Sequence, residues 1–360
     1  MATLTEVSFY TRRAVKYGLI GLFIILIAPV IWRGGKALYL RIRPAPPPPP
    51  TVAYGKLPFL QFGAGDDYKP SYKLETVNGT LPKLDKVGKV YVVEVNKSRL
   101  LELERVKTKA QGLGFTNEPE QVNDQTFKFI HPTNSSTLVV DVIYNTYKYQ
   151  YPWTLDQALY SGRAVPSNDQ AFLEAKAFWQ ALGLLASDLA EGKPQFAYFA
   201  AQPPQMLPVN SLSEANFTRV DLFRADLDKL PVVTTSGSHS PVNVIFSGIS
   251  DRGKRVVEAN YAYSKIVDGG FATYPLKTVD AAWNELQQGH GYIVKKAGSQ
   301  VVVRKIYLAY YESDSPQRFI QPIYVFEGDG GFVAYVPAID SGFVESAPVA
   351  PSGSSNTPSQ

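Results

Sequence analysis

Few residues of this 360-residue chain have the types and spacing that catalysis or metal binding requires. The three histidines are His131, His239 and His290, and none lies in a His-Glu-x-x-His motif or at another recognised ligand spacing. His239 lies in the loop-like stretch TSGSHSP, and His290 follows a predicted helix in QGHGY. The chain has no cysteine, which excludes a thiol nucleophile and a zinc ribbon. We therefore interpret the histidines as solvated loop residues.

The sequence also lacks the usual motifs for catalysis by a serine or by paired carboxylates. In FSGISDRG, Ser250 resembles the serine of a nucleophile elbow, but Arg252 stands where that motif needs its second glycine. Close acids occur at Asp66-Asp67 and in YESDSP, and we interpret them as solvated turn residues. The sequence therefore predicts that the protein is not an enzyme and has no catalytic, cofactor-binding or metal-binding residues. An enzyme acting on cell-wall polymer through a dispersed site is the alternative.

Aromatic residues near the C-terminus could bind another protein rather than catalyse a reaction. They lie on three predicted strands, and they are Tyr310, Tyr311, Tyr324, Phe326 and Tyr335. Alternate side chains of a strand share one face of the sheet, so these residues could form an exposed face that binds a partner. Alternatively, alternate members fill the core between the sheet and a helix.

The N-terminal segment determines the predicted location of the protein. An uncharged block runs from Gly18 to Trp32, and Tyr17 and Trp32 stand at its ends, where membrane proteins place aromatic residues. We therefore predict a retained signal anchor with one transmembrane helix at residues 17–32, after a short tail at residues 1–16. Membrane lipid is then one partner of the chain.

A basic collar and a polyproline linker follow the predicted anchor at residues 33–50. Polyproline is stiff, so the linker would hold the next domain off the bilayer. With the absence of cysteine, this favours a single-pass protein of the cell membrane with its N-terminus inside and a large extracytoplasmic domain. The Lys and Arg residues on the two flanks are nearly equal in number and lean toward the opposite orientation.

The net charge of +4 comes from the N-terminal region. The first 43 residues hold seven of the 36 basic residues and one of the 32 acidic residues, which leaves 29 basic and 31 acidic residues in the rest of the chain. A domain without a basic excess lacks the electrostatic footprint of a nucleic-acid-binding protein. We therefore expect no nucleic acid among the partners.

An internal repeat organises the region after the linker. Two predicted helices, in SRLLELERVKTKAQGLGF and NDQAFLEAKAFWQALGLL, reach Leu-Gly pairs that are 69 residues apart. Phe127 and Phe196, which begin the next predicted strands, are also 69 residues apart. Val140 and Val220 of the following longer strands are 80 residues apart, because the second copy has a longer loop that holds QPPQMLP. One repeat is thus a helix, a short strand and a long strand.

These patterns predict an α+β fold, in which repeated units of a helix plus antiparallel strands form a soluble ectodomain after the transmembrane helix. After an irregular lead-in, PFLQFGAGDDYKPSY, we expect a first unit at residues 51–150, a second at 151–235 and a third at 236–347. A disordered tail follows at residues 348–360.

The third unit resembles a known family. A helix carrying Ala281, Ala282, Trp283 and Leu286 precedes the predicted strands IYLAYY and QPIYVFEG, and this order is similar to the C-terminal part of YycH/YycI-type membrane-anchored regulators. A helix that ends near Leu-Gly and is followed by antiparallel strands resembles PepSY-like modules. The first resemblance implies a regulator of an envelope sensor kinase that acts by contact, and it transfers no catalytic residue.

The anchor, linker, repeat and missing catalytic motifs together predict a membrane-anchored, noncatalytic, extracytoplasmic binding or regulatory protein. It would act through contact with an envelope or membrane protein partner. The alternative, besides the enzyme above, is a structural or assembly accessory of an envelope or secretion apparatus.

Overall fold

The structure, a computed structural model, describes residues 15–19, 21–23, 25–29, 32–33, 35, 49–62, 68–96, 99–161 and 165–345. The chain divides into two compact units, Met1–Pro49 and Pro50–Gln360. The predictions for residues 1–14, 36–48 and 348–360 lie outside the described residues.

The predicted membrane anchor is not found among the described residues of the N-terminal unit. Its described residues between 15 and 33 are helical, and most of their large apolar side chains are exposed. None of the helices in the described part of the chain is long and apolar enough to cross a membrane. The transmembrane helix predicted at residues 17–32, with ends at Tyr17 and Trp32, is therefore wrong. The predicted single-pass location with an extracytoplasmic domain is wrong with it.

The length of the uncharged block explains this error. Fifteen helical residues span only about 22 Å, whereas the hydrocarbon core of a bilayer is about 30 Å thick. The prediction relied on the aromatic residues at the two ends, Tyr17 and Trp32, rather than on the length of the block.

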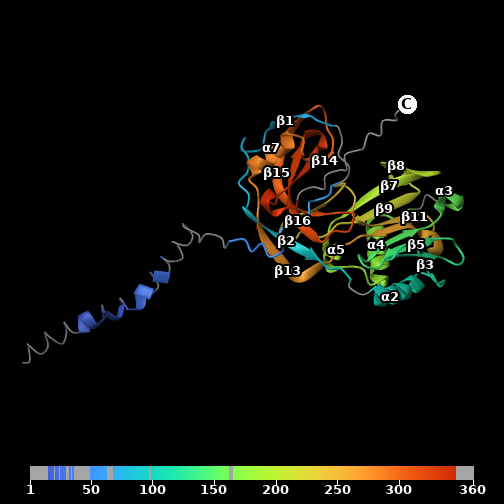
Figure 1. The fold of residues 1–360 in the computed structure, drawn as a ribbon, viewed down its shortest axis with the longest axis horizontal. Coiled ribbons are helices and arrows are strands. Elements are labelled where there is room, and N and C mark those ends of the chain that lie inside the picture. Colours follow the sequence, from blue (N-terminus) through green and yellow to red (C-terminus); the bar gives the residue numbers. More distant parts are fainter. Residues whose placement is uncertain are drawn as a thin grey trace, which may run out of the picture. The chain divides into compact units, whose positions relative to one another are not determined.

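The second unit, Pro50–Gln360, contains an eight-stranded sheet built mainly from its two ends (Figure 1). Its strands are β1 (Ser71–Leu74), β2 (Val87–Val93), β10 (Val232–Thr234), β13 (Ile266–Pro275), β14 (Tyr292–Lys295), β15 (Gln300–Glu312), β16 (Phe319–Gly328) and β17 (Val333–Pro337). The order β1-β15-β16-β17-β14 forms its main path, β2 joins β13 to β16, and β10 pairs with β15. Only β1 and β10 run parallel to their neighbour, β15.

The second sheet has nine antiparallel strands from the middle of the chain. Their order is β3 (Glu120–Gln121), β4 (Thr126–Ile130), β5 (Thr137–Asp141), β6 (Thr146–Gln150), β12 (Val256–Tyr261), β11 (Val242–Ser247), β9 (Phe217–Leu222), β7 (Pro194–Gln202) and β8 (Gln205–Val209). The named helices are α2 (Arg99–Gly112), α3 (Ala158–Ser161), α4 (Asn168–Ala181), α5 (Ser187–Glu191), α6 (Arg252–Arg255) and α7 (Val279–Gln287). Short 3₁₀ turns lie at Trp153–Leu155, Leu212–Glu214, Asp329–Gly331 and Ser341–Phe343.

The fold class is therefore mostly β, and the prediction of an α+β fold with a transmembrane helix is wrong. The helical patterns at α2, α4 and α7 do form helices, but strands also form where the sequence was interpreted as irregular. β1 begins at the end of the expected lead-in, and β8 forms from the expected loop QPPQMLP. Pairing with a neighbouring strand stabilises such short segments, and a local pattern does not contain that information.

Helices α2 and α4 pack on one face of the nine-stranded sheet. Val106 and Ala110 of α2 and Ala175 and Trp179 of α4 are buried in one apolar cluster with side chains of β4, β5, β9 and β11. The Ser167 hydroxyl caps α4 by accepting a hydrogen bond from the Gln170 N–H.

The two repeats detected in the sequence have the same strand register. Phe127 of β4 lies opposite Val140 of β5, and Phe196 of β7 lies opposite Val220 of β9. The offsets of 69 and 80 residues therefore connect positions that pair in the same way. The expected boundaries after residues 150 and 235 stay predictions, although strands from both sides of each boundary pair within one sheet: β6 with β12, and β9 with β11.

Helix α7 covers one face of the eight-stranded sheet. It begins after Thr278, whose hydroxyl accepts a hydrogen bond from the Ala281 N–H. Ala282 and Leu286 are buried against β15, β16 and β17, in a cluster that includes Tyr324 and Phe326.

A buried ion pair connects segments of the two sheets, and we call it the Arg224 clasp. Arg224 follows β9, and its Nη2 lies 3.0 Å from Glu312 Oε1 at the end of β15. The same guanidinium donates to the Ser264 carbonyl at 2.5 Å, and the Ser264 N–H donates to Glu312 at 3.1 Å. Asp188 of α5 lies 3.4 Å from Arg224 Nε, and the Tyr263 hydroxyl donates to Asp188 at 2.8 Å. Burial raises the pKa of the Glu312 carboxyl, and the Arg224 guanidinium opposes that rise.

We predict that Arg224→Met lowers the free energy of unfolding by about 3–5 kcal/mol, because it leaves the Glu312 carboxylate buried without its cation. The double variant Arg224→Met/Glu312→Leu should recover most of the loss, since neither charge is then buried. Urea unfolding at pH 7 measures both variants. A single variant that loses less than about 1 kcal/mol would show that Glu312 is compensated in another way.

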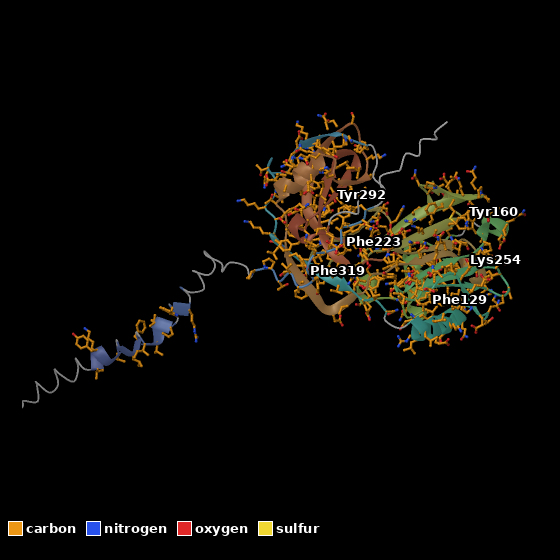
Figure 2. The ribbon with its side chains drawn as sticks, in the orientation of Figure 1. Phe129, Tyr160, Phe223, Lys254, Tyr292 and Phe319 are labelled. Carbon is orange, nitrogen blue, oxygen red and sulfur yellow. The ribbon has the colours of Figure 1, made fainter. Side chains whose placement is uncertain are left out.

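Gly192, which follows α5, packs closely against the backbone of Phe223 at the exit of β9. Phe223 is labelled in Figure 2. A Cβ atom at Gly192 would lie 1.7 Å from the Phe223 carbonyl oxygen. We predict that Gly192→Ala destabilises the protein by about 3 kcal/mol, because backbone must move to make room. The matched control is Gly112→Ala in α2, where nothing lies within 4 Å, and it should change stability by less than about 1 kcal/mol. Equal thermal unfolding of the two variants would contradict this packing.

Candidate functional site

The five aromatic residues expected to form an exposed partner-binding face are all buried, with at most 2% of each exposed. The residues are Tyr310, Tyr311, Tyr324, Phe326 and Tyr335. They therefore do not form an exposed face, and their burial agrees with the alternative that they fill the core.

The strand alternation also divides these residues between two faces of the eight-stranded sheet. Tyr324 and Phe326 belong to the cluster under α7, and Tyr310 packs against Tyr91 with ring centroids 5.4 Å apart. Tyr311 and Tyr335 belong to a different cluster, and their ring centroids lie 6.3 Å apart. Neighbouring positions such as Tyr310 and Tyr311 point to opposite faces because the side-chain period of a strand is two.

The face with Tyr311 and Tyr335 is covered by an extended segment from the start of the second unit, residues 58–62, which we call the strap. Leu60 of the strap is buried in this cluster. Phe62 stacks on Tyr292 with ring centroids 5.1 Å apart and meets the Tyr311 ring edge-on at 4.9 Å. Alternate apolar side chains of the strap thus pack against the aromatic side chains of the sheet.

Side chains rather than backbone pairing hold the strap. Within the described residues, no backbone-to-backbone hydrogen bond involves residues 58–62. Gln321 Nε2 donates to the Pro58 carbonyl at 3.0 Å, and the Tyr311 hydroxyl donates to the Gln61 carbonyl at 3.4 Å. The chain is fixed just before the strap, where the Leu57 N–H donates to the Phe343 carbonyl at 2.8 Å.

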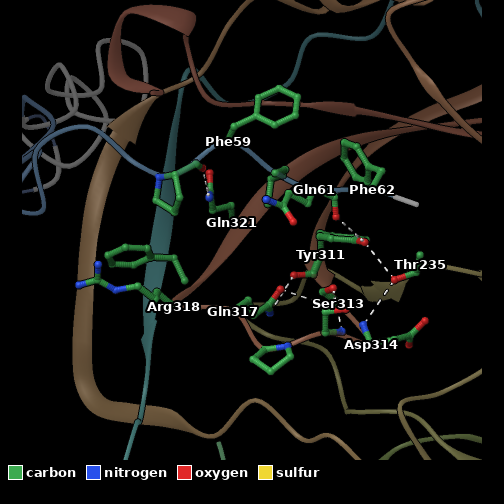
Figure 3. Close-up of a pocket in the computed structure, with 15 residues that line it drawn as sticks. Phe59, Gln61, Phe62, Thr235, Tyr311, Ser313, Asp314, Gln317, Arg318 and Gln321 are labelled. Atoms are coloured by element: carbon green, nitrogen blue, oxygen red, sulfur yellow. Dashed lines mark hydrogen bonds between the residues drawn. The ribbon is translucent and has the colours of Figure 1, made fainter. Parts of the chain in front are cut away.

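A pocket of about 390 Å³ lies beside the strap, and we call it the strap pocket (Figure 3). The lining consists of strap residues, Thr235, Tyr311, Gln321 and the connection between β15 and β16 at residues 313–319. In Figure 3 the strap residues Phe59 and Phe62 lie along one side of the pocket, and Ser313 and Gln317 lie along the other. Phe59 is 43% exposed, so the pocket has an accessible aromatic wall.

Polar groups on the floor and rim of the strap pocket bond mainly to one another. The hydroxyls of Thr235 and Tyr311 lie 3.0 Å apart, and Gln317 Oε1 accepts from the Ser313 N–H at 3.1 Å. Partial burial raises the pKa of the Asp314 carboxyl, while the Thr235 hydroxyl lowers it. Asp314 and Arg318 contribute one charge of each sign. This lining suits an apolar side chain accompanied by amide groups, as an extended peptide presents.

The three histidines lie on separate elements. His131 Nδ1 accepts from the backbone N–H of Thr133 at 3.3 Å, and His239 is hydrogen-bonded to Arg219. His290 follows α7, and its N–H donates to the Glu285 carbonyl at 2.9 Å. In the part of the chain that the structure describes, no group of three or more His, Asp or Glu side chains could hold a metal ion. The absence of enzyme activity stays a prediction.

The strap was not predicted from the sequence, because PFLQF was interpreted as part of an irregular lead-in. A signal was present: Leu60 and Phe62 are apolar at alternate positions, as in a strand that buries one face. Only the structure shows that this short segment lies on the strands near the C-terminal end of the unit.

Comparisons with known proteins add little. No family model and no curated protein matches the sequence. Among solved structures, the fold is similar to an uncharacterized protein from Eubacterium rectale ATCC 33656, with a TM-score of 0.40 and 11% sequence identity over 71% of this chain and 84% of that chain. A similarity at this level carries no argument about function.

We predict that Phe62→Ala lowers the free energy of unfolding by about 2–4 kcal/mol, because it removes a ring packed on two tyrosines. Phe59→Ala is the matched control in the same segment, and it should cost less than about 1 kcal/mol because Phe59 is 43% exposed and lies outside the aromatic cluster. Urea unfolding of both variants measures the difference. If both variants lose the same stability, Phe62 does not hold the strap.

Proposed function

We propose that the protein is a noncatalytic binding protein that acts through contact with another protein. Its binding site is the strap seat, the aromatic face of Tyr292, Tyr311 and Tyr335 together with the strap pocket. The ligand is an extended segment of the partner with apolar side chains at alternate positions. The partner segment takes the place of the strap, which occupies the seat when no partner is bound.

The observation that carries this proposal is the strap itself, which acts as an internal example of the ligand. Leu60 and Phe62 show which side chains the seat accepts, and their spacing of two residues shows that the ligand is extended. The strap makes no described backbone-to-backbone hydrogen bond with the sheet. A segment held mainly by two apolar side chains can be exchanged without breaking a strand pairing.

The strap pocket provides a place for the partner to begin this exchange. A volume of about 390 Å³ is within the range of ligand sites, which usually measure about 300–1,000 Å³. Its accessible wall is Phe59, and exposed aromatic side chains are enriched where proteins bind one another. The rim charges of Asp314 and Arg318 balance, which disfavours a polyanionic partner such as nucleic acid.

The resemblance of the last strands to YycH/YycI-type regulators favours the same class of function, because that family acts by contact. The helix with Ala282 and Trp283 and the strands IYLAYY and QPIYVFEG, which carry the resemblance, are α7, β15 and β16. β15 and β16 are the strands on which the strap lies. Regulation by contact thus fits both the resemblance and the site.

We predict that the synthetic peptide LPFLQF, which contains Leu57 and the strap, binds to the Phe62→Ser variant at least about tenfold more tightly than to the unchanged protein. The internal strap competes with the peptide, and the variant weakens that competitor. Fluorescence anisotropy of the labelled peptide measures the affinities.

The control peptide LPFSQS lacks both seat-filling side chains and should not bind to either protein. A second control is the exposed substitution Leu155→Ser, which should leave peptide affinity as in the unchanged protein. The proposal fails if LPFLQF does not bind to a folded Phe62→Ser variant, or if both peptides bind equally.

A further inference from the structure

A second site lies at the junction of the two sheets and is separate from the strap seat. Two cavities of about 630 Å³ and about 190 Å³ are lined in part by the same residues, Lys109, Asn145, Tyr263 and Lys265. We call these two cavities the junction groove. Lys109 comes from α2, Asn145 from the turn between β5 and β6, and the other two residues from the connection between β12 and β13.

Most charged side chains of the junction groove are compensated by a neighbour. Lys265 lies 2.7 Å from Glu94, Arg105 lies 2.5 Å from Glu102, and Arg224 lies 3.4 Å from Asp188. Lys109 differs from them: among the described residues it has no ion pair and no hydrogen bond. Its ammonium lies 5.6 Å from the centroid of the Tyr147 ring. Lys109 therefore presents to both cavities a positive charge without an ion-pair partner among the described residues, although the Glu102 carboxylate in the smaller cavity attracts it.

Tyr147 positions a second donor beside this lysine. It is 4% exposed, and its hydroxyl donates to Asn145 Oδ1 at 3.0 Å. The acceptor end of the Asn145 amide is thus occupied, and its NH₂ group has no partner among the described residues. A buried tyrosine therefore places its ring under the Lys109 ammonium and fixes the Asn145 side chain with its donor group free.

We propose that the junction groove binds a carboxylate group of a small ligand through the Lys109 ammonium and the Asn145 NH₂ group. A cation and a neutral donor form charge-assisted and neutral hydrogen bonds with the two oxygens of a carboxylate. One cation without an ion-pair partner matches one negative charge. Asp268 also lines the larger cavity and has no ion pair among the described residues, so it disfavours ligands with a higher negative charge such as phosphate dianion.

The protonation of Lys109 should be linked to the binding of a carboxylate. Burial lowers the pKa of the Lys109 ammonium, and Glu102 opposes the effect. A bound carboxylate would favour the charged form, so ligand binding should raise the pKa of Lys109 and be weaker at high pH, where the amine is neutral.

The test uses the full chain with its lysines ¹³C-dimethylated, which keeps their charge, and acetate as the probe. We expect the Lys109 methyl signal, assigned by its absence in Lys109→Gln, to shift saturably as acetate is added at constant ionic strength. Inorganic phosphate should cause a smaller shift. Asn145→Asp should weaken the acetate response by about tenfold or more, because it replaces a donor by a like charge.

Lys107→Gln is the matched control, because Lys107 lies on the same helix and is already paired with Glu118 at 2.8 Å. That variant should bind acetate as the unchanged protein does. The proposal is overturned if the Lys109 signal moves no more than those of exposed lysines, or if the folded Asn145→Asp variant responds equally. A phosphate response as strong as the acetate response would overturn the assignment to a carboxylate.

Discussion

The Arg224 clasp is the interaction on which the arrangement of the second unit depends. It brings together the exit of β9, the connection between β12 and β13 and the end of β15, so segments of both sheets meet at one guanidinium. A buried ion pair contributes little net stability, since desolvation offsets most of the attraction. Its effect is on specificity: an arrangement that separated Arg224 from Glu312 would leave two uncompensated charges in the interior. The clasp therefore makes alternative packings of the sheets costly.

Both proposed sites contain residues that belong to the Arg224 clasp or directly adjoin it. Glu312 directly follows Tyr311, which forms part of the strap seat, and the two residues lie on opposite faces of β15. On the other side, Arg224, Asp188 and Tyr263 line the larger cavity of the junction groove. β15 is thus the element through which the position of the strap seat is fixed relative to the junction groove. Since the strand is packed on both faces along most of its length, neither site can shift without disturbing the core.

Local patterns predicted the parts of this fold that depend on local physics. The apolar stripes of α2, α4 and α7 are periodic, and hydroxyl caps at Ser167 and Thr278 mark the start of two of these helices. The spacing of Phe127 and Val140, compared with Phe196 and Val220, also identified positions that share a strand register. The same patterns could not predict which strands join into one sheet. β6 pairs with β12 across more than a hundred residues, and no local periodicity determines such a partner.

At the candidate site too, the local sequence pattern did not predict contacts between residues that are far apart in the chain. The aromatic residues of β15, β16 and β17 were expected either to form an exposed partner-binding face or to fill the core, because a pattern of alternation does not show what covers each face. One face is covered by α7, a recognisable helix, whereas the other is covered by the five-residue strap. Gln61 and Tyr311, which hydrogen-bond there, are 250 positions apart in the sequence. A face covered by a short segment without backbone pairing is only weakly closed, because the cost of removing two apolar side chains is much smaller than that of removing a helix. The difference between the two coverings, rather than the aromatic residues themselves, is the reason for proposing that a partner binds to one face of this sheet.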